Sequence, residues 1–306
     1  MYLNRKKIEI SSNQNVQFKQ FKSLTESKGL KKEGLCLLSG KKLIQEFLEQ
    51  QVQALKPLKI IGEICPAKSS MKSDSDNSPH YLKSNLDTNT EYKNNSKLAL
   101  DTAITELLKS VPQYLLSAEL FNSIDMVGTD QNILIVEQPQ MTVFDFTANT
   151  ATNNQGLSLL CPLGDPNNLG AIIRSAEAFG AERVILLQEA AHAFLPKTIK
   201  ASAGSVFRVP LFKGPSIREL SQTQKNTKSS IIVLDLNGEE LPKFQWPKNS
   251  FLLIGEEGPG APSDLAATRL NIPTKHVESL NAMVAASIAM YDYSQKSKIF
   301  ASGAAK

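Results

Sequence analysis

One arginine in this sequence lies in a stretch whose residue types suit ligand binding or catalysis. Residues 165–180, DPNNLGAIIRSAEAFG, begin as a loop rich in Asp, Pro and Asn and continue into a predicted helix that carries Arg174 in its early turns. We expect Asn167 or Asn168 to cap this helix. Because the pKa of a guanidinium exceeds about 12, Arg174 is a permanent cation, suited to holding a phosphate or an oxyanion. A capped helix with an ordinary surface arginine would have the same sequence, so this stretch alone decides nothing.

A second stretch, LLIGEEGPGAP at residues 252–262, runs from an apolar strand into a loop with three glycines and two adjacent glutamates. Its spacing is GxxGxG, not the GxGxxG of dinucleotide-binding folds, and no Lys-Ser/Thr pair follows as in a phosphate-binding loop. The loop therefore suits a ligand that brings positive charge or hydrogen-bond donors. A plain glycine turn at a strand end is the alternative, and nothing here indicates a nicotinamide-dependent dehydrogenase.

The third stretch, NIPTKHVESLNAMVAASIAMYDY at residues 271–293, leads into a helix crowded with alanines. We expect Ser279 to be the N-cap of this helix, which leaves Asn281 in the first turn without a capping role. Small side chains allow backbones to approach closely, so the helix is expected to pack tightly against another element or a second subunit. His276 stands among charged residues and is interpreted as exposed, not as a ligand.

The elements that must position these stretches follow from the apolar pattern. From residue 157 on, the runs LSLLCPL, RVILL, VFRVPLF, SIIVLDL and SFLLIGE alternate with predicted helices at 169–180, 215–222 and 279–296. Continuous apolar runs are typical of strands buried on both faces of a parallel sheet. The sequence therefore predicts an α/β domain whose ligands bind at the carboxyl ends of the strands.

The first half of the chain is predicted to be a smaller α/β unit that contains a long polar segment. Residues 66–97 are strongly polar and predict a surface insertion, and the Thr- and Asn-rich residues 147–156 predict a linker. These features divide the chain into a domain at 1–146 and a second at 157–306. The elements predicted for the first domain are helices at 41–50, 99–109 and 117–123 and strands at 58–64 and 132–138.

Composition narrows the class of protein. The 306 residues are 41% hydrophobic, enough for a real core, and the net charge of +4 leans only slightly toward a polyanionic partner. Residues 1–50 hold ten Lys and Arg against five Glu. Three scattered cysteines, Cys36, Cys65 and Cys161, argue against a disulfide framework or a zinc site. With no apolar leader in MYLNRKKIEI and no run of about 20 apolar residues, we expect a cytoplasmic protein.

Taken together, the motifs resemble one family. NNLGAIIRSAEAFGAERVIL, then KASAGSVFRVP (200–210), LLIGEEGPG and IPTKHVESLN resemble the successive signature motifs of the SpoU (TrmH-like) family, the RNA ribose 2'-O-methyltransferases of the SPOUT superfamily. The resemblance covers residues 157–296. More weakly, residues 21–48 and 120–139 are similar to the L30e-like α/β domain that precedes the catalytic domain in many members and binds RNA.

The resemblance implies a fold that the apolar pattern does not suggest. The C-terminal part of the parallel sheet would be threaded into a trefoil knot, although knots are nearly absent from proteins. S-adenosyl-L-methionine would sit folded in that knot, and a homodimer through the knotted domain would complete the active site. The substrate would be RNA, with ribosomal RNA favoured over transfer RNA by the separate N-terminal domain. A nonenzymatic RNA-binding protein on the same scaffold is the alternative from another class.

Site residues are carried over from the family motifs. The catalytic set is Asn168, Arg174, Glu257, Ser279 and Asn281. The cofactor-binding set is Leu234, Gly255, Gly258, Gly260, Ile272, Leu280 and Asn281, with the loop from Leu234 to Gly238 expected to border the adenosine. Departures from the family pattern are Thr274 for a usual Met, Ala282-Met283 for a usual Val-Ser and, in the N-terminal domain, Ser39 for a common acidic residue. None of these removes a catalytic residue.

The roles follow from the reaction. Methyl transfer to a ribose hydroxyl needs aligned reactants and stabilisation of a poorly acidic oxygen. Our hypothesis is that Arg174, acting on the cofactor of the opposite subunit, holds the nucleotide and stabilises the 2'-oxyanion. A deprotonated Arg174 acting as a base is less favoured. The basic N-terminal segment would contact RNA phosphates or would simply be a solvated face. Its candidate RNA-binding residues are Lys28, Lys31, Lys32, Lys41 and Lys42.

Overall fold

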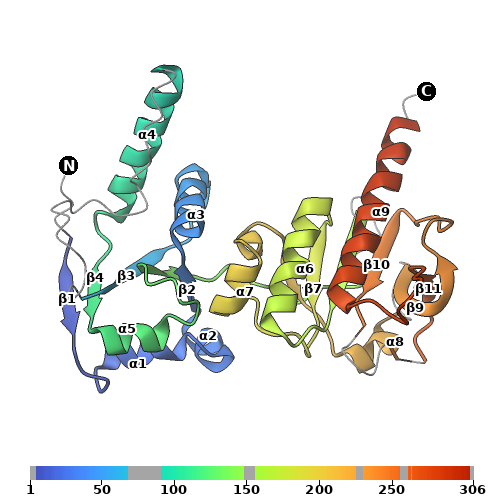
Figure 1. Ribbon diagram of the computed structural model, residues 1–306, viewed down its shortest axis with the longest axis horizontal. Helices are drawn as coiled ribbons and strands as arrows, with labels where there is room; N and C mark the ends of the chain where they lie inside the picture. The colour runs from blue at the N-terminus through green and yellow to red at the C-terminus, as the bar shows by residue number, and fades with distance from the viewer. Residues whose placement is uncertain are drawn as a thin grey trace. The chain divides into compact units, whose positions relative to one another are not determined.

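The computed structural model describes residues 5–67, 91–147, 156–224, 230–255, 261–262 and 264–303. Its chain contacts divide the protein into two units (Figure 1). The first comprises Met1–Pro139 with Phe194–Lys200, and the second comprises Gln140–Ala193 with Ala201–Lys306. No helix in the described part of the chain is long and apolar enough to cross a membrane.

The division falls a few residues before the predicted boundary at 146. The rings of Phe144 and Phe146 pack against Phe251 of the second unit, with centroids 5.9 and 5.5 Å from it. Residues 140–146 thus pack with the second unit, although the polarity of the following stretch had placed the boundary after them. Of the predicted linker, only the ends Thr147 and Gly156 belong to the described residues.

The first unit is a mixed five-stranded sheet in the order β1-β4-β3-β5-β2. Strands β1, β4 and β3 are mutually parallel, and β5 runs antiparallel to both β3 and β2. Figure 1 shows α3 and α4 on one side of this sheet and α1, α2 and α5 on the other. Its elements are β1 (Lys7–Ile10), α1 (Val16–Ser23), α2 (Ser27–Glu33), β2 (Leu35–Ser39), α3 (Lys41–Gln53), β3 (Ile60–Pro66), α4 (Glu91–Leu108), β4 (Gln113–Leu116), α5 (Ala118–Ile124) and β5 (Ile133–Glu137).

Every element predicted for this half is present, and the structure adds β1, α1, α2, β2 and β4. The predicted insertion at 66–97 is too long, because α4 already begins at Glu91. Residues 68–90 lie outside the described part of the chain.

A buried ion pair joins Arg5, just before the edge strand β1, to Glu63 of β3. The Arg5 guanidinium donates from Nη1 to Glu63 Oε2 at 2.5 Å and from Nε to the Val111 carbonyl at 2.7 Å. The Glu63 carboxylate also accepts from Gln113 at 3.0 Å and from Asn132 at 2.8 Å. Since Glu63 is fully buried, these donors replace the water that its charge has lost.

The second unit is an all-parallel six-stranded sheet in the order β11-β9-β10-β6-β7-β8, which confirms the predicted parallel α/β domain. Its strands are β6 (Gly156–Cys161), β7 (Arg183–Leu186), β8 (Leu211–Lys213), β9 (Ser230–Glu240), β10 (Asn249–Leu253) and β11 (Thr268–Asn271). Its helices are α6 (Pro166–Phe179), η2 (Ser205–Phe207), η3 (Ile217–Glu219), α8 (Leu220–Gln224) and α9 (Ala282–Gly303), while α7 (Pro196–Ala201) lies almost wholly in the segment grouped with the first unit.

Helices α6 and α9 pack against each other, as Figure 1 shows, and Ser287 Oγ of α9 donates to Ser175 Oγ of α6 at 2.9 Å. The buried side chains of β6, β7, β9 and β10 form a core with Ile217 and Leu220. The chain between β10 and β11, on which a knot would depend, includes residues 256–260 and 263, which are not described. The knot therefore stays a prediction.

Candidate active site

The start of α6 differs from its prediction. Asp165 is the N-cap, and its Oδ1 accepts from the backbone N–H groups of Asn167 at 2.9 Å and Asn168 at 2.8 Å. The expected cap at Asn167 or Asn168 is wrong because Pro166 takes the first helical position. Proline suits that position, where its fixed φ is helical and its missing N–H is not needed. Asn168 is thus already inside the helix, one turn and a half before Arg174.

Arg174 lies on the exposed side of α6. The opposite side of the helix buries Leu169, Ile172, Ile173 and Ala176. Among the described residues, the Arg174 guanidinium has no hydrogen-bond or ion-pair partner. Within the described part of the chain, no other residue therefore takes up its charge.

The start of α9 also differs from its prediction. Asn281 is the N-cap: its Oδ1 accepts from the N–H groups of Met283 at 2.9 Å and Val284 at 3.4 Å, and its carbonyl accepts from Ala285 at 2.9 Å. The predicted cap at Ser279 is wrong because the helix begins only at Ala282. The capping role that was assigned to Ser279 belongs to Asn281, and Ser279 lies in the loop before the helix.

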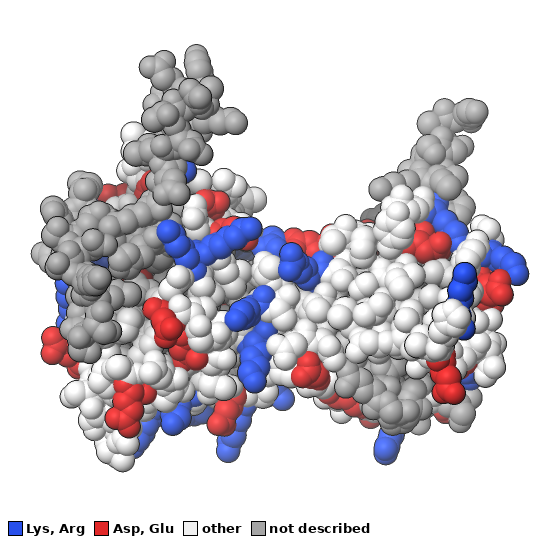
Figure 2. All heavy atoms as spheres, in the orientation of Figure 1, with Lys and Arg blue, Asp and Glu red and all other residues white. Residues whose placement is uncertain are grey.

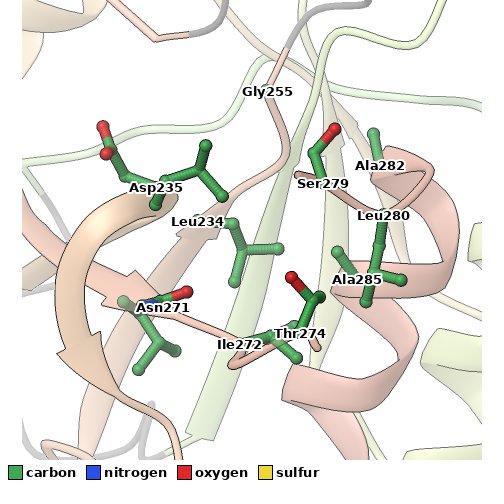
Figure 3. Close-up of a pocket in the computed structure, with 12 residues that line it drawn as sticks. Leu234, Asp235, Gly255, Asn271, Ile272, Thr274, Ser279, Leu280, Ala282 and Ala285 are labelled. Atoms are coloured by element: carbon green, nitrogen blue, oxygen red, sulfur yellow. The ribbon is translucent and has the colours of Figure 1, made fainter. Parts of the chain in front are cut away.

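A pocket lies where the middle of β9 and the carboxyl ends of β10 and β11 meet the beginning of α9 (Figure 3). This is the place where parallel sheets bind ligands. Four of the predicted cofactor-binding residues line it, namely Leu234, Gly255, Ile272 and Leu280, and so does Ser279 from the predicted catalytic set. In Figure 3, Leu234 lies between Asp235 on one side and Ser279 and Leu280 on the other.

Other predicted residues fall elsewhere. Glu257, Gly258 and Gly260 lie outside the described residues. Asn168 and Arg174 belong to α6, and they and the N-cap Asn281 are not part of the pocket lining. The structure thus brings four residues of the predicted cofactor set together with Ser279, but it does not bring Arg174 into the same pocket.

The pocket also has residues that the sequence analysis did not assign to a site. They are Leu270, Asn271 and Ala285, together with Thr274 and Ala282, which had been noted only as departures. Asp235 and Leu236 also line the pocket, and they belong to the loop that was expected to border the adenosine. Only the small size of Ala282 and Ala285 distinguishes them, because their side chains leave room beside Leu280.

The predicted loop at Leu234–Gly238 has a clear counterpart. Strand β9 pairs with β11 through Ile232 and Val233, and the pairing resumes only at Glu239. The five intervening residues bulge away from the ladder, and Leu234, Asp235 and Leu236 line the pocket. Gly238 closes the bulge, because a Cβ there would lie 2.4 Å from the backbone carbon of Arg269. Only glycine lets the bulge return so close to β11.

Two local contacts hold the pocket walls. Asp235 forms an ion pair with Arg269, and its Oδ1 also accepts from the N–H of Asn237 at 2.9 Å. On the other side, Thr274 Oγ1 donates to the carbonyl of Val277 at 2.6 Å. This second contact closes the turn that leads to Ser279 and Leu280.

The chemistry of the lining selects a ligand class. Apolar side chains predominate, and the polar ones are an acid, an amide and two hydroxyls, with no Lys, Arg or His among them. Such a pocket holds an apolar or flat group and offers acceptors to hydroxyl or amino groups. With the Asp235 carboxylate paired to Arg269 and no Lys, Arg or His in the lining, the pocket offers little to a polyphosphate.

The candidate RNA-binding lysines are exposed but do not form one face. Lys28, Lys31 and Lys32 lie on α2, whereas Lys41 and Lys42 begin α3, on the other side of the sheet (Figure 1). Lys32 pairs with Glu33 at 3.2 Å and Lys42 with Glu46 at 3.7 Å. Figure 2 likewise shows basic and acidic side chains interspersed over the visible surface.

Comparison with known proteins adds a family. The model of the SpoU rRNA Methylase family matches residues 158–291. A ribosomal RNA small subunit methyltransferase G 2 from Syntrophobacter fumaroxidans is 31% identical over 94% of this chain, but the chain spans only 49% of that relative, about half its length. The 23S rRNA (guanosine(2553)-2'-O)-methyltransferase RlmP from Bacillus subtilis is 29% identical, covering 94% of this chain and 98% of the relative.

Solved structures agree on the fold. The crystal structure of an AdoMet-bound rRNA methyltransferase from Sinorhizobium meliloti matches with a TM-score of 0.67 and 21% identity, covering 94% of this chain and 98% of that one. The SpoU methyltransferase AviRb from Streptomyces viridochromogenes, in complex with AdoMet, matches with the same TM-score and identity over 93% and 99%. The chain therefore has the mixed α/β fold of these structures.

Proposed function

On the match of residues 158–291 to the model of the SpoU rRNA Methylase family, we propose that the protein transfers a methyl group from S-adenosylmethionine to a ribose 2'-hydroxyl of RNA. The observation that carries the proposal is the pocket. Leu234, Gly255, Ile272 and Leu280 were selected as cofactor-binding from motifs spread over the chain, and all four line one cavity at the carboxyl ends of parallel strands.

The residues present suit this cofactor. Leu234, Ile272 and Leu280 offer apolar surface to a purine. The Asn271 amide and the backbone beside Gly255 offer partners to hydroxyl and amino groups, and the Asp235 carboxylate, already paired with Arg269, offers a further acceptor to a hydroxyl. When bound, S-adenosylmethionine supplies a methyl group already activated by a positively charged sulfur.

The residues of the chain then have to align the ribose and stabilise its oxygen. Alignment alone contributes at most about 7–11 kcal/mol to lowering the barrier. The Arg174 guanidinium acts as a fixed cation toward the developing 2'-oxyanion and the neighbouring phosphate. Asn168, on the same helix, and Ser279, in the pocket wall, orient the nucleotide. Asn281 and the undescribed Glu257 keep the roles that the family motifs assign to them.

A second copy of the chain is part of the proposal. Arg174 does not line the pocket of its own chain, so we assign it to the pocket of a partner subunit. Helix α9, which packs on α6, exposes Val284, Ile288 and Tyr291 by 40%, 37% and 54%. Their spacing of four and three residues places them on one helix face. A second copy that covers this apolar face would bring the neighbouring α6, with Arg174, to the interface.

The favoured substrate is ribosomal RNA. RlmP, which aligns over nearly its whole length, is named as a 23S rRNA 2'-O-methyltransferase, and a two-unit chain offers a separate region for binding RNA. Relatives named as tRNA/rRNA methyltransferases match only about half of this chain. Transfer RNA is therefore the alternative substrate that the experiment must include.

The test is transfer of labelled methyl groups from S-adenosylmethionine to ribosomal RNA and to transfer RNA, offered separately. Arg174→Ala is compared with Arg218→Ala, which removes another exposed arginine of the same unit. We expect label in alkali-resistant 2'-O-methyl dinucleotides of one RNA class, lost in Arg174→Ala and kept in Arg218→Ala. Full turnover by Arg174→Ala would refute its role, and no label with either RNA and no cofactor binding would favour a nonenzymatic RNA-binding protein.

The dimer is tested by analytical ultracentrifugation of Ile288→Asp. A charge on the apolar face should shift the protein from dimer to monomer and reduce methyl transfer together. A wild-type protein that sediments as a monomer while fully active would remove the second copy from the mechanism.

A further inference from the structure

Glu177 stands where it would be expected to neutralise Arg174. It follows Arg174 by three residues on α6, and side chains at this spacing are neighbours on a helix surface. An exposed arginine and an ionised glutamate in this arrangement ordinarily attract each other. Such a pair would occupy the guanidinium that the proposed reaction needs.

The structure shows a different partner. Both Glu177 oxygens are engaged by Arg208, with Nε donating to Oε1 at 2.5 Å and Nη2 donating to Oε2 at 2.8 Å. The hydroxyl of Ser205, which is 1% exposed, also donates to Oε2 at 2.6 Å. Two parallel N–H···O bonds between a guanidinium and a carboxylate are stronger and more directional than a single contact. Glu177 is thereby held toward η2, and Arg174 is left without a partner among the described residues.

The same contacts keep Glu177 charged. Hydrogen bonds from Arg208 hold the pKa of the Glu177 carboxyl below its ordinary value, and the Ser205 hydroxyl acts in the same direction against the effect of burial. Glu177 is therefore an anion throughout the working pH range. If Arg208 were absent, this anion would remain beside Arg174 on the same helix.

The backbone before η2 is shaped for this arrangement. Ala203 has φ +47° and Gly204 has φ +81°, both in the left-handed region. For a residue with a Cβ, this conformation costs about 1–2 kcal/mol. Arg208 Nη2 donates to the Ala203 carbonyl at 3.3 Å, so the arginine that binds Glu177 also closes the strained turn. One side chain thus fixes both the turn and the carboxylate.

We propose that Arg208 and Ser205 are positioning residues that hold Glu177 away from Arg174 and so keep the Arg174 guanidinium available to RNA. The inference rests on the proposed function, since it assumes that Arg174 acts on the substrate. It differs from a purely structural role, in which Arg208 would only anchor the turn to α6. The two roles make opposite predictions for a double variant.

The experiment compares wild type, Arg208→Gln, Glu177→Gln and the double variant Arg208→Gln/Glu177→Gln. Releasing Glu177 in Arg208→Gln allows it to pair with Arg174, and the strength of such helix pairs predicts a loss of about two- to threefold in kcat/KM for RNA. The loss should grow at low ionic strength, where exposed ion pairs are less screened. Removing the charge of Glu177 should restore the double variant to the wild-type value, and Glu177→Gln alone should stay near it.

Cofactor affinity, measured by calorimetry in all four proteins, should be unchanged, because neither residue lines the pocket. A double variant as slow as Arg208→Gln, with normal cofactor affinity, would overturn the inference and leave the turn anchor as the role of Arg208. An inactive wild type would instead overturn the proposed function, and this inference with it.

Discussion

Asn281 offers a quantitative test, because the structure gives it a capping role while the family motifs give it a catalytic one. In Asn281→Ala, the N–H groups of Met283 and Val284 lose their acceptor. Loss of an N-cap side chain costs about 1 kcal/mol. For a unit of this size, that corresponds to a decrease in Tm of about 2–4 °C.

Two further variants separate capping from catalysis. Asn281→Asp keeps an acceptor at the N-cap and places a negative charge where the helix dipole favours it. Its Tm should be at least that of wild type, but the amide donors are gone, so methyl transfer should fall. Ser279→Ala removes the residue that sequence reasoning took for the cap, and its Tm should not change.

Thermal unfolding monitored by circular dichroism at 222 nm is the assay for stability, and labelled methyl transfer is the assay for activity. If Ser279→Ala lowered Tm and Asn281→Ala did not, the assignment of the N-cap to Asn281 would be refuted. A stable Asn281→Asp with full turnover would show that capping is the whole contribution of Asn281.

Three other outcomes are expected. Arg5→Met leaves the buried Glu63 carboxylate without its cation and should lower the free energy of unfolding by about 3–5 kcal/mol. Lys109→Met removes one partner of an exposed ion pair and should lower it by at most about 1 kcal/mol. Denaturant titration of both variants measures the difference. Thr274→Val removes the hydroxyl that closes the turn to Val277 and should weaken S-adenosylmethionine binding about fivefold by calorimetry, with Thr274→Ser near wild type. The pKa of Glu177 is lowered from 4.5. The stability that its ionised carboxylate contributes is therefore complete above pH 4.5 and is lost as the pH falls through the lowered pKa. In measurements of Tm against acid pH, Glu177→Gln should abolish this dependence.

Each of these has a clear contradiction. Equal destabilisation by Arg5→Met and Lys109→Met would mean that the buried pair is not needed. Equal cofactor affinities for Thr274→Val and Thr274→Ser would remove the turn from the binding site. If the Tm of Glu177→Gln depended on acid pH as that of wild type does, another carboxyl would be responsible for the dependence.

The parallel sheet and its binding edge could be predicted because they depend on patterns that are local in the sequence. Continuous apolar runs of five to seven residues are buried on both faces only in a covered sheet, and β6, β7, β9 and β10 have that pattern. In a parallel sheet, the carboxyl ends lie on one edge, so residues that follow different strands were expected near one another. Gly255 and Ile272, which follow β10 and β11, confirm this.

Helix caps were predicted less well, for a different reason. Asp165, Asn167 and Asn168 all have side chains that can cap a helix, and so do Ser279 and Asn281. Their types do not distinguish them. The choice depends on where the chain first takes helical φ and ψ, which is set by Pro166 in one case and by the loop from Thr274 in the other.

Residue types and spacing by themselves indicated the α/β class of the second unit, the family that residues 158–291 match and four residues that share the pocket. Only the tertiary structure decided the partner of Glu177. Helix geometry places Arg174 within its reach, yet Glu177 binds Arg208, which lies 31 residues further along the chain. Spacing in the sequence gives the local candidates for a contact, but folding brings in distant ones. A bidentate contact reinforced by a buried hydroxyl is stronger than a single contact along an exposed helix.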